Sequence, residues 1–319
     1  MKPPAIRTEG LVRTFGPVRA LDNLTFEVPS GIVFGFLGPN GAGKTTAIRT
    51  FLGLVEPTAG RAEVLGFDTR YESDKIRERS GALLEHPGLY ERLTAAQNLE
   101  FTGRVWRMSK AERRARAQEL LEQFGLWERR NQPVGQWSRG MKQKLAVARA
   151  VFHRPPLVFL DEPTAGLDPV ASAALRDDLV RLASAEGVTI FLTTHNLTEA
   201  ERLCSLVGVI QRGRLAALGP PRDLRAREVS RTVHVVARNL APAVIDAVAA
   251  VTGVEAAHAT PDGLEVRLAP EASAAPVVAL LVTCGAAVEE VRRVRPTLEE
   301  AFLELVTNSD GHVPPQEPR

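Results

Sequence analysis

Apolar residues alternate with polar ones at the start of the chain and recur at helical spacing further along it. The alternation in residues 5–35 has a period of two, which predicts β-strands. Residues 93–124 instead place apolar side chains three and four positions apart, and Ser109 followed by Glu112 predicts a capping box at a helix start. The pattern therefore predicts a β-rich beginning and then a helical subdomain over residues 90–155.

Two largely apolar runs follow, at residues 157–160 and 188–192, with a helical pattern at 170–183 between them. A strand, a helix and a second strand in this order indicate parallel strands of one buried sheet. Such sheets bind ligands at the carboxyl ends of their strands. Two acids, Asp161 and Glu162, follow the first run directly, so they are candidates for a functional site.

The composition changes around residues 219–223, which predicts a domain boundary. Beyond it, short runs follow in the order β-α-β-β-α-β, which is the order of a ferredoxin-like α+β domain. We therefore expect a main domain over residues 5–220 and a small C-terminal accessory domain over residues 221–307. Residues 298–306 predict a final amphipathic helix, and residues 308–319 have the composition of a disordered tail.

Composition and charge narrow the class of protein. The 319 residues carry 40 Lys and Arg against 38 Asp and Glu, so the balance gives no reason to expect a nucleic-acid partner. No run reaches the ~20 apolar residues of a membrane span, and no signal-peptide pattern opens the chain. We expect a chain that is soluble by itself, with Cys204 and Cys284 as small buried residues in a reducing compartment.

The stretch G-P-N-G-A-G-K-T-T follows a strand-like run and precedes an apolar helical pattern. That context predicts a phosphate-binding loop, with glycines at positive φ that point backbone N–H groups at oxyanions. Its lysine can reach the β- and γ-phosphates of ATP, and its first threonine can ligate Mg²⁺. The alternative is a glycine-rich turn with an exposed lysine. The predicted nucleotide-binding residues here are Gly38, Pro39, Asn40, Gly41, Ala42, Gly43, Lys44, Thr45 and Thr46.

The phosphate-binding loop suggests functions for the two acids Asp161 and Glu162. Asp161 can hold the magnesium ion together with Thr45, directly or through water. Glu162 can orient or deprotonate an attacking water molecule. Paired acids at strand ends are common and would mean little alone, but their combination with a phosphate-binding loop favours a catalytic function.

At this point the chain resembles the nucleotide-binding subunit of an ATP-binding cassette (ABC) transporter. Beside the phosphate loop, the resemblance rests on L-V-F-L-D-E-P at 157–163, S-R-G-M at 138–141 in place of the family signature, A-G-L-D at 165–168 and T-T-H at 193–195. It covers residues 5–220. It implies an ATPase with the P-loop NTPase fold of ABC type, in which a helical subdomain is inserted into a mixed β core.

The resemblance also implies roles for five further residues. Ser138 and Gly140 would bind the γ-phosphate of ATP held by a second copy of the chain, in a head-to-tail dimer with two composite sites; the alternative for Ser138 is an ordinary N-cap. His195 would contact the γ-phosphate and hold the water, where a lone histidine is otherwise usually structural. Phe15 would stack on adenine, unless it is a core residue. Asp168 belongs to the implied nucleotide site.

Three positions depart from the family pattern. Glu85 replaces the usual glutamine, and we expect it to remain a magnesium ligand. Arg139 replaces a glycine, so positive φ would be less comfortable there, and Met141 replaces a glutamine. These variants resemble a bacterial branch that includes daunorubicin-resistance and sodium-efflux exporters, which implies a separate membrane permease and a place on the cytoplasmic face of the membrane. The transported substrate and the role of the C-terminal domain stay open.

Two other classes compete with an exporter ATPase. A soluble ABC-type ATPase acting on nucleic acid or the ribosome would usually carry two cassettes or a coiled-coil insertion, and neither occurs in this sequence. A kinase or GTPase would share the phosphate loop but would have no use for the signature stretch and the switch histidine.

Overall fold

The computed structural model describes residues 3–226, 232–269 and 272–294. They divide into two compact units, the first ending at Pro221 and the second beginning at Arg222. The helix predicted at 298–306 and the tail predicted at 308–319 lie outside the described residues.

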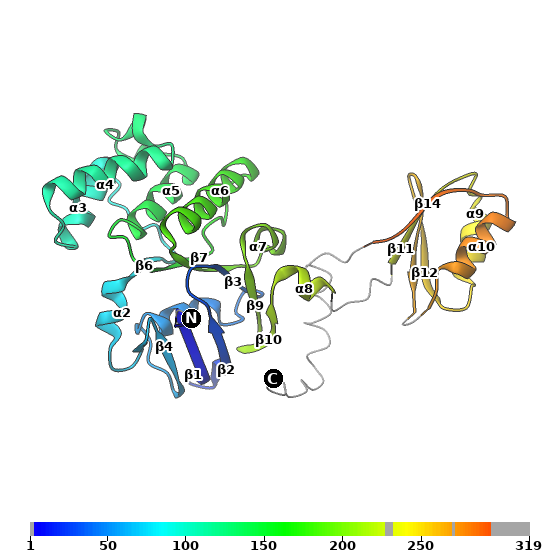
Figure 1. The fold of residues 1–319 in the computed structure, drawn as a ribbon, viewed down its shortest axis with the longest axis horizontal. Helices are drawn as coiled ribbons and strands as arrows, with labels where there is room; N and C mark the ends of the chain where they lie inside the picture. The colour runs from blue at the N-terminus through cyan, green and yellow to red at the C-terminus, as the bar shows by residue number, and fades with distance from the viewer. Residues whose placement is uncertain (1–2, 227–231, 270–271, 295–319) are drawn as a thin grey trace. The chain divides into compact units, whose positions relative to one another are not determined.

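Two sheets build the first unit (Figure 1). One is a four-stranded antiparallel sheet in the order β2-β1-β4-β5, and the other has six strands in the order β10-β9-β3-β8-β7-β6. In the larger sheet only β10 runs antiparallel to its neighbour. The strands are β1 (Ile6–Phe15), β2 (Val18–Val28), β3 (Val33–Leu37), β4 (Ala59–Val64), β5 (Phe67–Asp68), β6 (Ser80–Leu83), β7 (Leu157–Asp161), β8 (Thr189–Thr194), β9 (Leu206–Gln211) and β10 (Arg214–Gly219).

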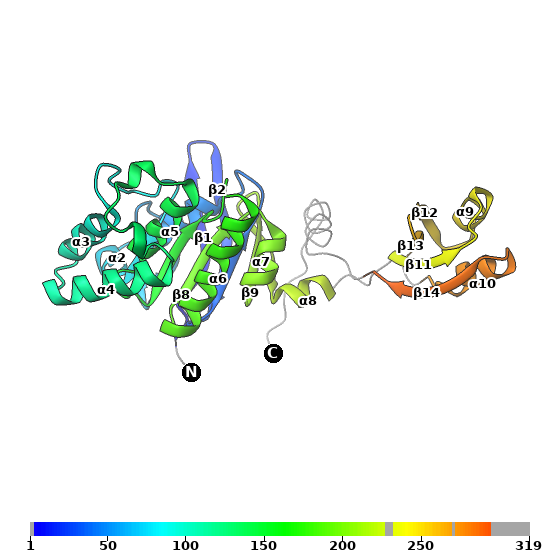
Figure 2. The ribbon, with the colours of Figure 1, turned by 90° about the horizontal axis from the view of Figure 1, so that it is seen from above.

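Helices cover the larger sheet and form the predicted helical subdomain. Figure 2 shows α6 and α7 on one side of the six-stranded sheet, while the antiparallel sheet lies on the other. The subdomain helices α3, α4 and α5 pack on one another, and Ser109 and Glu112 form the predicted capping box of α4. The helices are α1 (Lys44–Phe51), α2 (Ser73–Arg79), α3 (Ala95–Val105), α4 (Lys110–Gln123), η1 (Trp127–Arg129), η2 (Val134–Gln136), α5 (Arg139–Ala150), α6 (Pro169–Glu186) and α7 (Leu197–Leu203); α8 (Pro221–Ala226) begins at the division between the units.

A cluster of buried phenylalanines joins the two sheets and fixes the strands that carry the functional loops. Neighbouring rings lie 5.3 to 6.4 Å apart between centroids, in stacked, tilted and edge-on contacts. Such aromatic pairs add about 0.5–1.5 kcal/mol each beyond the burial of their area. The strand ends therefore rest on a rigid base, made of Phe26, Phe34, Phe36, Phe51, Phe159 and Phe191.

The second unit has the strand order predicted for a ferredoxin-like domain. Its antiparallel sheet runs β12-β13-β11-β14, and alternate residues of β11 face a core shared with both helices. Cys284 is exposed at the C-terminal end of α10, so the prediction that both cysteines are buried is wrong for this one; Cys204 is buried. The elements are β11 (Thr232–Arg238), α9 (Pro242–Ala249), β12 (Val254–Thr260), β13 (Gly263–Leu268), α10 (Ala275–Thr283) and β14 (Ala287–Arg293).

Among the described residues, no helix is both long enough and apolar enough to cross a bilayer.

Candidate nucleotide-binding site

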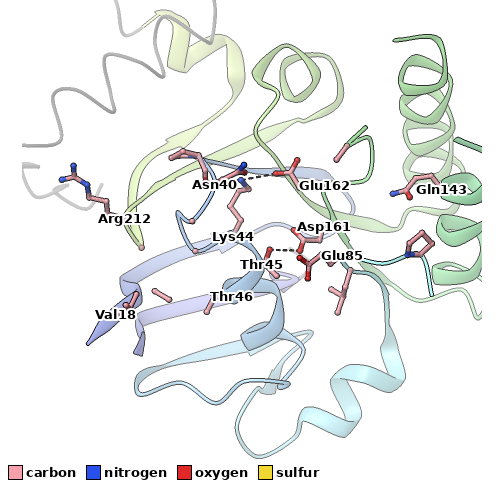
Figure 3. Close-up of a pocket in the computed structure, with 18 of the residues that line it drawn as sticks. Val18, Asn40, Lys44, Thr45, Thr46, Glu85, Gln143, Asp161, Glu162 and Arg212 are labelled. Carbon is pink, nitrogen blue, oxygen red and sulfur yellow. Dashed lines mark hydrogen bonds and ion pairs between the residues drawn. The ribbon is translucent and has the colours of Figure 1, made fainter. Parts of the chain in front are cut away.

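A cavity of about 790 Å³ lies in the first unit, between the loop that joins β3 to α1 and the start of α5 (Figure 3). The carboxyl end of β7 forms its floor, and Figure 3 shows Gln143 pointing from α5 toward the side that holds Glu162. Seven of the nine residues predicted from the glycine-rich loop line the cavity: Pro39, Asn40, Gly41, Gly43, Lys44, Thr45 and Thr46.

The backbone of this loop depends on its glycines in two different ways. Gly41 and Gly43 have φ of 78° and 109°, as the sequence predicted, in a region that other residues rarely adopt. The same prediction is wrong for Gly38, which is not at positive φ. A side chain at Gly38 would overlap the carbonyl oxygen of Ile210, so this glycine is needed for the close approach of β9.

A hairpin turn that the sequence patterns did not predict supports the loop from behind. The N–H of Gly213, between β9 and β10, donates to the carbonyl of Ala42 over 3.0 Å, and the Gly213 carbonyl accepts from the N–H of Asp22 over 2.8 Å. Arg212 and Gly213 also line the cavity. Arg212 and Gly213 both have positive φ, at 47° and 80°, as a two-residue hairpin turn requires, and the glycine between two apolar runs was the usable signal.

The N-terminus of α1 is open toward the cavity. Its N-cap is Gly43, no side chain caps it, and its first turn holds no acid. The first amides of a helix lack intrahelical acceptors, and the helix dipole makes this end partly positive. The arrangement fits the phosphate groups of a nucleotide.

Lys44 is held beneath this helix end. Its side chain is 7% exposed, and Nζ donates to the carbonyl oxygens of Gly38 at 2.7 Å and Pro39 at 3.3 Å. Nζ also lies 3.2 Å from a carboxylate oxygen of Glu162. The alternative of a glycine-rich turn with an exposed lysine is therefore excluded, because this ammonium group is buried among acceptors.

Asp161 links the loop to the end of β7. Its two carboxylate oxygens accept from the hydroxyls of Thr45, over 2.8 Å, and Thr193, over 2.5 Å. Carboxylate and hydroxyl oxygens are the ligands that Mg²⁺ prefers, and the ion usually keeps several waters, so the pair of Asp161 and Thr45 beside the open cavity fits a magnesium ion.

Glu162 has a strained backbone and two side-chain nitrogen groups as neighbours. Its φ is 49°, which is uncommon for a residue with a side chain. Its N–H donates to the hydroxyl and the carbonyl oxygen of Thr193, at 3.0 and 3.2 Å. One carboxylate oxygen faces Lys44 and the other lies 2.8 Å from Nδ1 of His195. Strain of this kind is kept where surrounding contacts over-determine it, often at functional sites.

A buried carboxylate, which the sequence did not single out, steadies the segment that carries His195. Glu199 is 3% exposed and accepts from the hydroxyls of Thr164, at 2.6 Å, and Thr194, at 3.4 Å. Arg176 lies 3.6 Å from its other oxygen. His195 itself is more than half exposed and touches the site through Glu162 instead of lining the cavity.

Two predicted residues lie less centrally. Glu85 lines the cavity, but its carboxylate is 70% exposed and pairs with Arg49 at 3.4 Å. Phe15 is 45% exposed and carries the guanidinium of Arg13 over its ring at 4.3 Å, so it is not a core residue. Phe15 is not part of the cavity wall in the single chain.

The signature stretch meets the start of α6. The Ser138 hydroxyl accepts from the N–H of Met141 as the N-cap of α5, and Asp168 caps α6 in the same way, with 2.8 Å to the N–H of Ala171. A Cβ on Gly140 would stand 3.1 Å from the Cβ of Ala171. Arg139 is the first residue of α5 and is not at positive φ, so the expected discomfort there was wrong: the helix supplies an ordinary backbone for it.

Comparison with known proteins agrees with this geometry. The ABC transporter family matches residues 21–165, and the family described as ATP-binding protein DrrA1-3-like, C-terminal domain, matches residues 219–306. Daunorubicin resistance ATP-binding protein DrrA3 of Streptomyces coeruleorubidus is 39% identical, over 98% of this chain and 99% of its own.

Two solved structures share the fold of the first unit. CbiO1 of Clostridium perfringens, part of the ABC transporter complex CbiONQ, superposes with a TM-score of 0.66 at 28% identity, over 72% of this chain and 93% of its own. The bacterial ABC transporter cassette MJ0796, solved as a dimer, gives 0.61 at 26% identity, over 67% and 98%. The chain therefore belongs to the ATP-binding proteins of ABC transporters, a family of ATPases, and carries the C-terminal domain of their DrrA1-3-like group.

Proposed function

We propose that this chain hydrolyses ATP as the motor subunit of an exporter, in which a separate membrane permease carries the substrate. The proposal rests above all on Glu162, whose carboxylate stands between Lys44 at 3.2 Å and His195 at 2.8 Å, beside the Asp161–Thr45 pair. A carboxylate held between two nitrogen groups at the mouth of a phosphate-fitting cavity is suited to take a proton from water.

Each residue of the site has a separate role in ATP binding or hydrolysis. The loop amides at the start of α1 and the ammonium of Lys44 bind the β- and γ-phosphates, and Asp161 and Thr45 hold Mg²⁺, with Glu85 as a further ligand. The ion, when bound, neutralises phosphate charge. Glu162 accepts the proton of the attacking water, and His195 orients both the carboxylate and the γ-phosphate. Phe15 stacks on the adenine.

The site is completed by a second copy of the chain. In this proposal Ser138, Gly140 and Asp168 of one copy face the nucleotide held by the loop of the other, in a head-to-tail dimer. A cassette that shares this fold was solved as a dimer, which supports dimer formation. ATP binding closes the dimer, and hydrolysis lets it open.

The partner is a permease, and the place of work is the cytoplasmic face of a bacterial membrane. The similar protein of Streptomyces coeruleorubidus is named for daunorubicin resistance, which favours export over import. The charge balance of +2 gives no support to a nucleic-acid partner.

The test of the proposal is Glu162→Gln, which keeps the shape of the side chain and removes the base. We expect the turnover number to fall by roughly 10²- to 10⁴-fold, because this is the usual contribution of general acid–base catalysis. ATP binding should persist, and ATP should trap dimers that sedimentation detects.

Glu78→Gln is the matched control, because Glu78 is exposed on α2 and lies outside the cavity wall. It should hydrolyse ATP like the unchanged protein. Hydrolysis by Glu162→Gln at the unchanged rate would refute Glu162 as the base, and failure of the chain to bind ATP at all would refute the function.

A further inference from the structure

Arg139 differs from three other cations of the cavity wall in having no carboxylate partner among the described residues. Within the described residues, no hydrogen bond or ion pair joins Arg139 to another side chain, although it lines the cavity. Three other cations of the same wall each have a carboxylate partner: Lys44 with Glu162, Lys142 with Glu91 at 2.7 Å, and Arg19 with Asp22 at 2.9 Å.

The guanidinium of Arg139 nevertheless has a defined position, over the backbone of Gly166. If Gly166 carried a Cβ, that atom would stand 2.8 Å from Nη2 of Arg139 and closer still to Cζ and Nη1. Gly166 is at a φ of 69°, which also disfavours a side chain. The glycine therefore leaves the space that the guanidinium occupies.

Gly166 belongs to the turn that begins at the proposed catalytic base. The N–H of Ala165 donates to the carbonyl oxygen of Glu162 over 3.1 Å, and the N–H of Leu167 donates to that of Thr164 over 3.1 Å. Arg139 thus packs on the same short segment that sets the direction of Glu162, and none of its guanidinium N–H groups is bonded to another described residue.

The chemistry of that group follows from the donor. A guanidinium presents a planar fork of N–H donors that fits phosphate oxygens, and such charge-assisted bonds are stronger than neutral ones. The nearby N-terminus of α5, capped by the neutral Ser138, adds partial positive charge, whereas the carboxylate of Asp168 offsets the dipole of α6. An anion with several oxygens is the best match for this surface.

We propose that Arg139 is a second cationic ligand of the terminal phosphate of ATP, held in place by packing on Gly166. The inference rests on the proposed function and adds a residue to its site. The phosphate belongs either to the ATP on the chain's own loop, whose cavity Arg139 lines, or to the ATP on a second copy. In both cases Arg139 distinguishes ATP from ADP, because ADP lacks the group that it binds.

The experiment compares the affinities for ATP and ADP by calorimetric titration, with hydrolysis blocked by Glu162→Gln throughout. Adding Arg139→Gln should lower the affinity for ATP at least about 10-fold, as expected for the loss of a hydrogen bond to a charged group. The affinity for ADP should change less than about 2-fold. Arg139→Lys should recover part of the loss, since it keeps the charge without the fork. Arg114→Gln, an exposed arginine of α4 outside the cavity wall, is the control and should change neither affinity.

Gly166→Ala gives an independent readout. With Arg139 present, this substitution should lower the affinity for ATP but not the affinity for ADP, because the new methyl group displaces the guanidinium. Combined with Arg139→Gln it should add no further selective loss.

Protein concentration separates the two sources of the phosphate. If Arg139→Gln lowers ATP affinity at concentrations where sedimentation finds monomers, Arg139 binds the phosphate of the ATP on its own chain. An effect that appears only in dimers assigns the ATP of the second copy.

Equal weakening of ATP and ADP, or none, would overturn the inference and leave Arg139 as a packing residue. Loss of ATP binding by Glu162→Gln alone would instead refute the proposed function, so the two failures are distinguishable.

Discussion

The two walls of the nucleotide cavity differ in how far their polar groups are already satisfied. On the wall formed by the large sheet and α1, Lys44 and Asp161 are 7% and 6% exposed, and each has partners from its own chain. On the wall formed by α5, Lys142 pairs with Glu91 at the surface, while Arg139 is exposed and has no partner among the described side chains.

The difference follows from the cost of burial. A buried charge without a partner is expensive, so the sheet wall must be complete before any ligand arrives. An exposed arginine is hydrated, so it carries no such cost before a ligand binds. Under the proposed function, we expect the sheet wall to bind phosphate without rearrangement and Arg139 of the α5 wall to gain its partner only when a nucleotide binds. Variants of the two walls should fail in different ways.

The largest effect should come from the sheet wall. Lys44→Ala removes a buried cation that faces Glu162 and the proposed phosphates. We expect ATP affinity to fall by about 100-fold or more, because hydrogen bonds to charged groups contribute about 1.5–3 kcal/mol and the carboxylate of Glu162 would then repel the phosphates without a cation between them. Calorimetric titration measures it. If Lys44→Ala lowered ATP affinity less than Arg139→Gln does, the sheet wall would not be the main phosphate-binding wall.

A second effect concerns His153, which follows the end of α5 and packs against the end of α3. His153 stacks on Trp106, with 3.7 Å between ring centroids. Burial lowers the pKa of His153 from 6.5 to about 4, and the charge of Arg116 adds to the shift. Below pH 6.5 the unfolded chain binds a proton that the folded chain excludes, so stability falls as the pH drops from 6.5 toward 4.

The loss should be about 2 kcal/mol across that window, allowing for partial exposure of the ring. His153→Phe keeps an aromatic ring against Trp106 and removes the titration. Urea unfolding at pH 7 and pH 4.5 should show a smaller drop for this variant than for the unchanged chain. An equal drop in both proteins would mean that other groups cause the acid sensitivity.

The smallest effect on the isolated chain should come from Ser138→Ala. Loss of an N-cap costs about 1 kcal/mol, so thermal unfolding should shift only slightly. If the α5 wall gains its partners on binding, the same change should reduce ATP-driven dimer formation in the Glu162→Gln background, as seen by sedimentation. An unchanged dimer fraction would leave Ser138 as a cap alone.

Local patterns predicted those parts of the fold and site whose physics is local. The strand-loop-helix context of residues 38–46 located the phosphate-fitting loop, and the apolar run before Asp161 located a buried strand end. The ferredoxin-like order of the second unit was also readable, because each of its elements carries its own period.

Contacts between distant segments could not be predicted in this way. Position 38 requires glycine because the carbonyl oxygen of Ile210 lies against it, and the Arg139 guanidinium fits where it does because Gly166 has no side chain. The exposure of Phe15 and of Cys284 depends on where an element ends relative to the surface. Such facts arise only when the chain is folded, since the residues concerned are far apart in sequence or at ends that patterns place imprecisely.

The bond from Gly213 to Ala42 sets a limit on where the chain can be shortened. A fragment that stopped before the β9–β10 hairpin would contain the whole G-P-N-G-A-G-K-T-T stretch and yet leave one of its carbonyl oxygens without a donor and Asp22 without its acceptor. The smallest piece able to keep the loop's shape thus extends through Gly219, the last residue of β10, which brings it almost to the division between the two units.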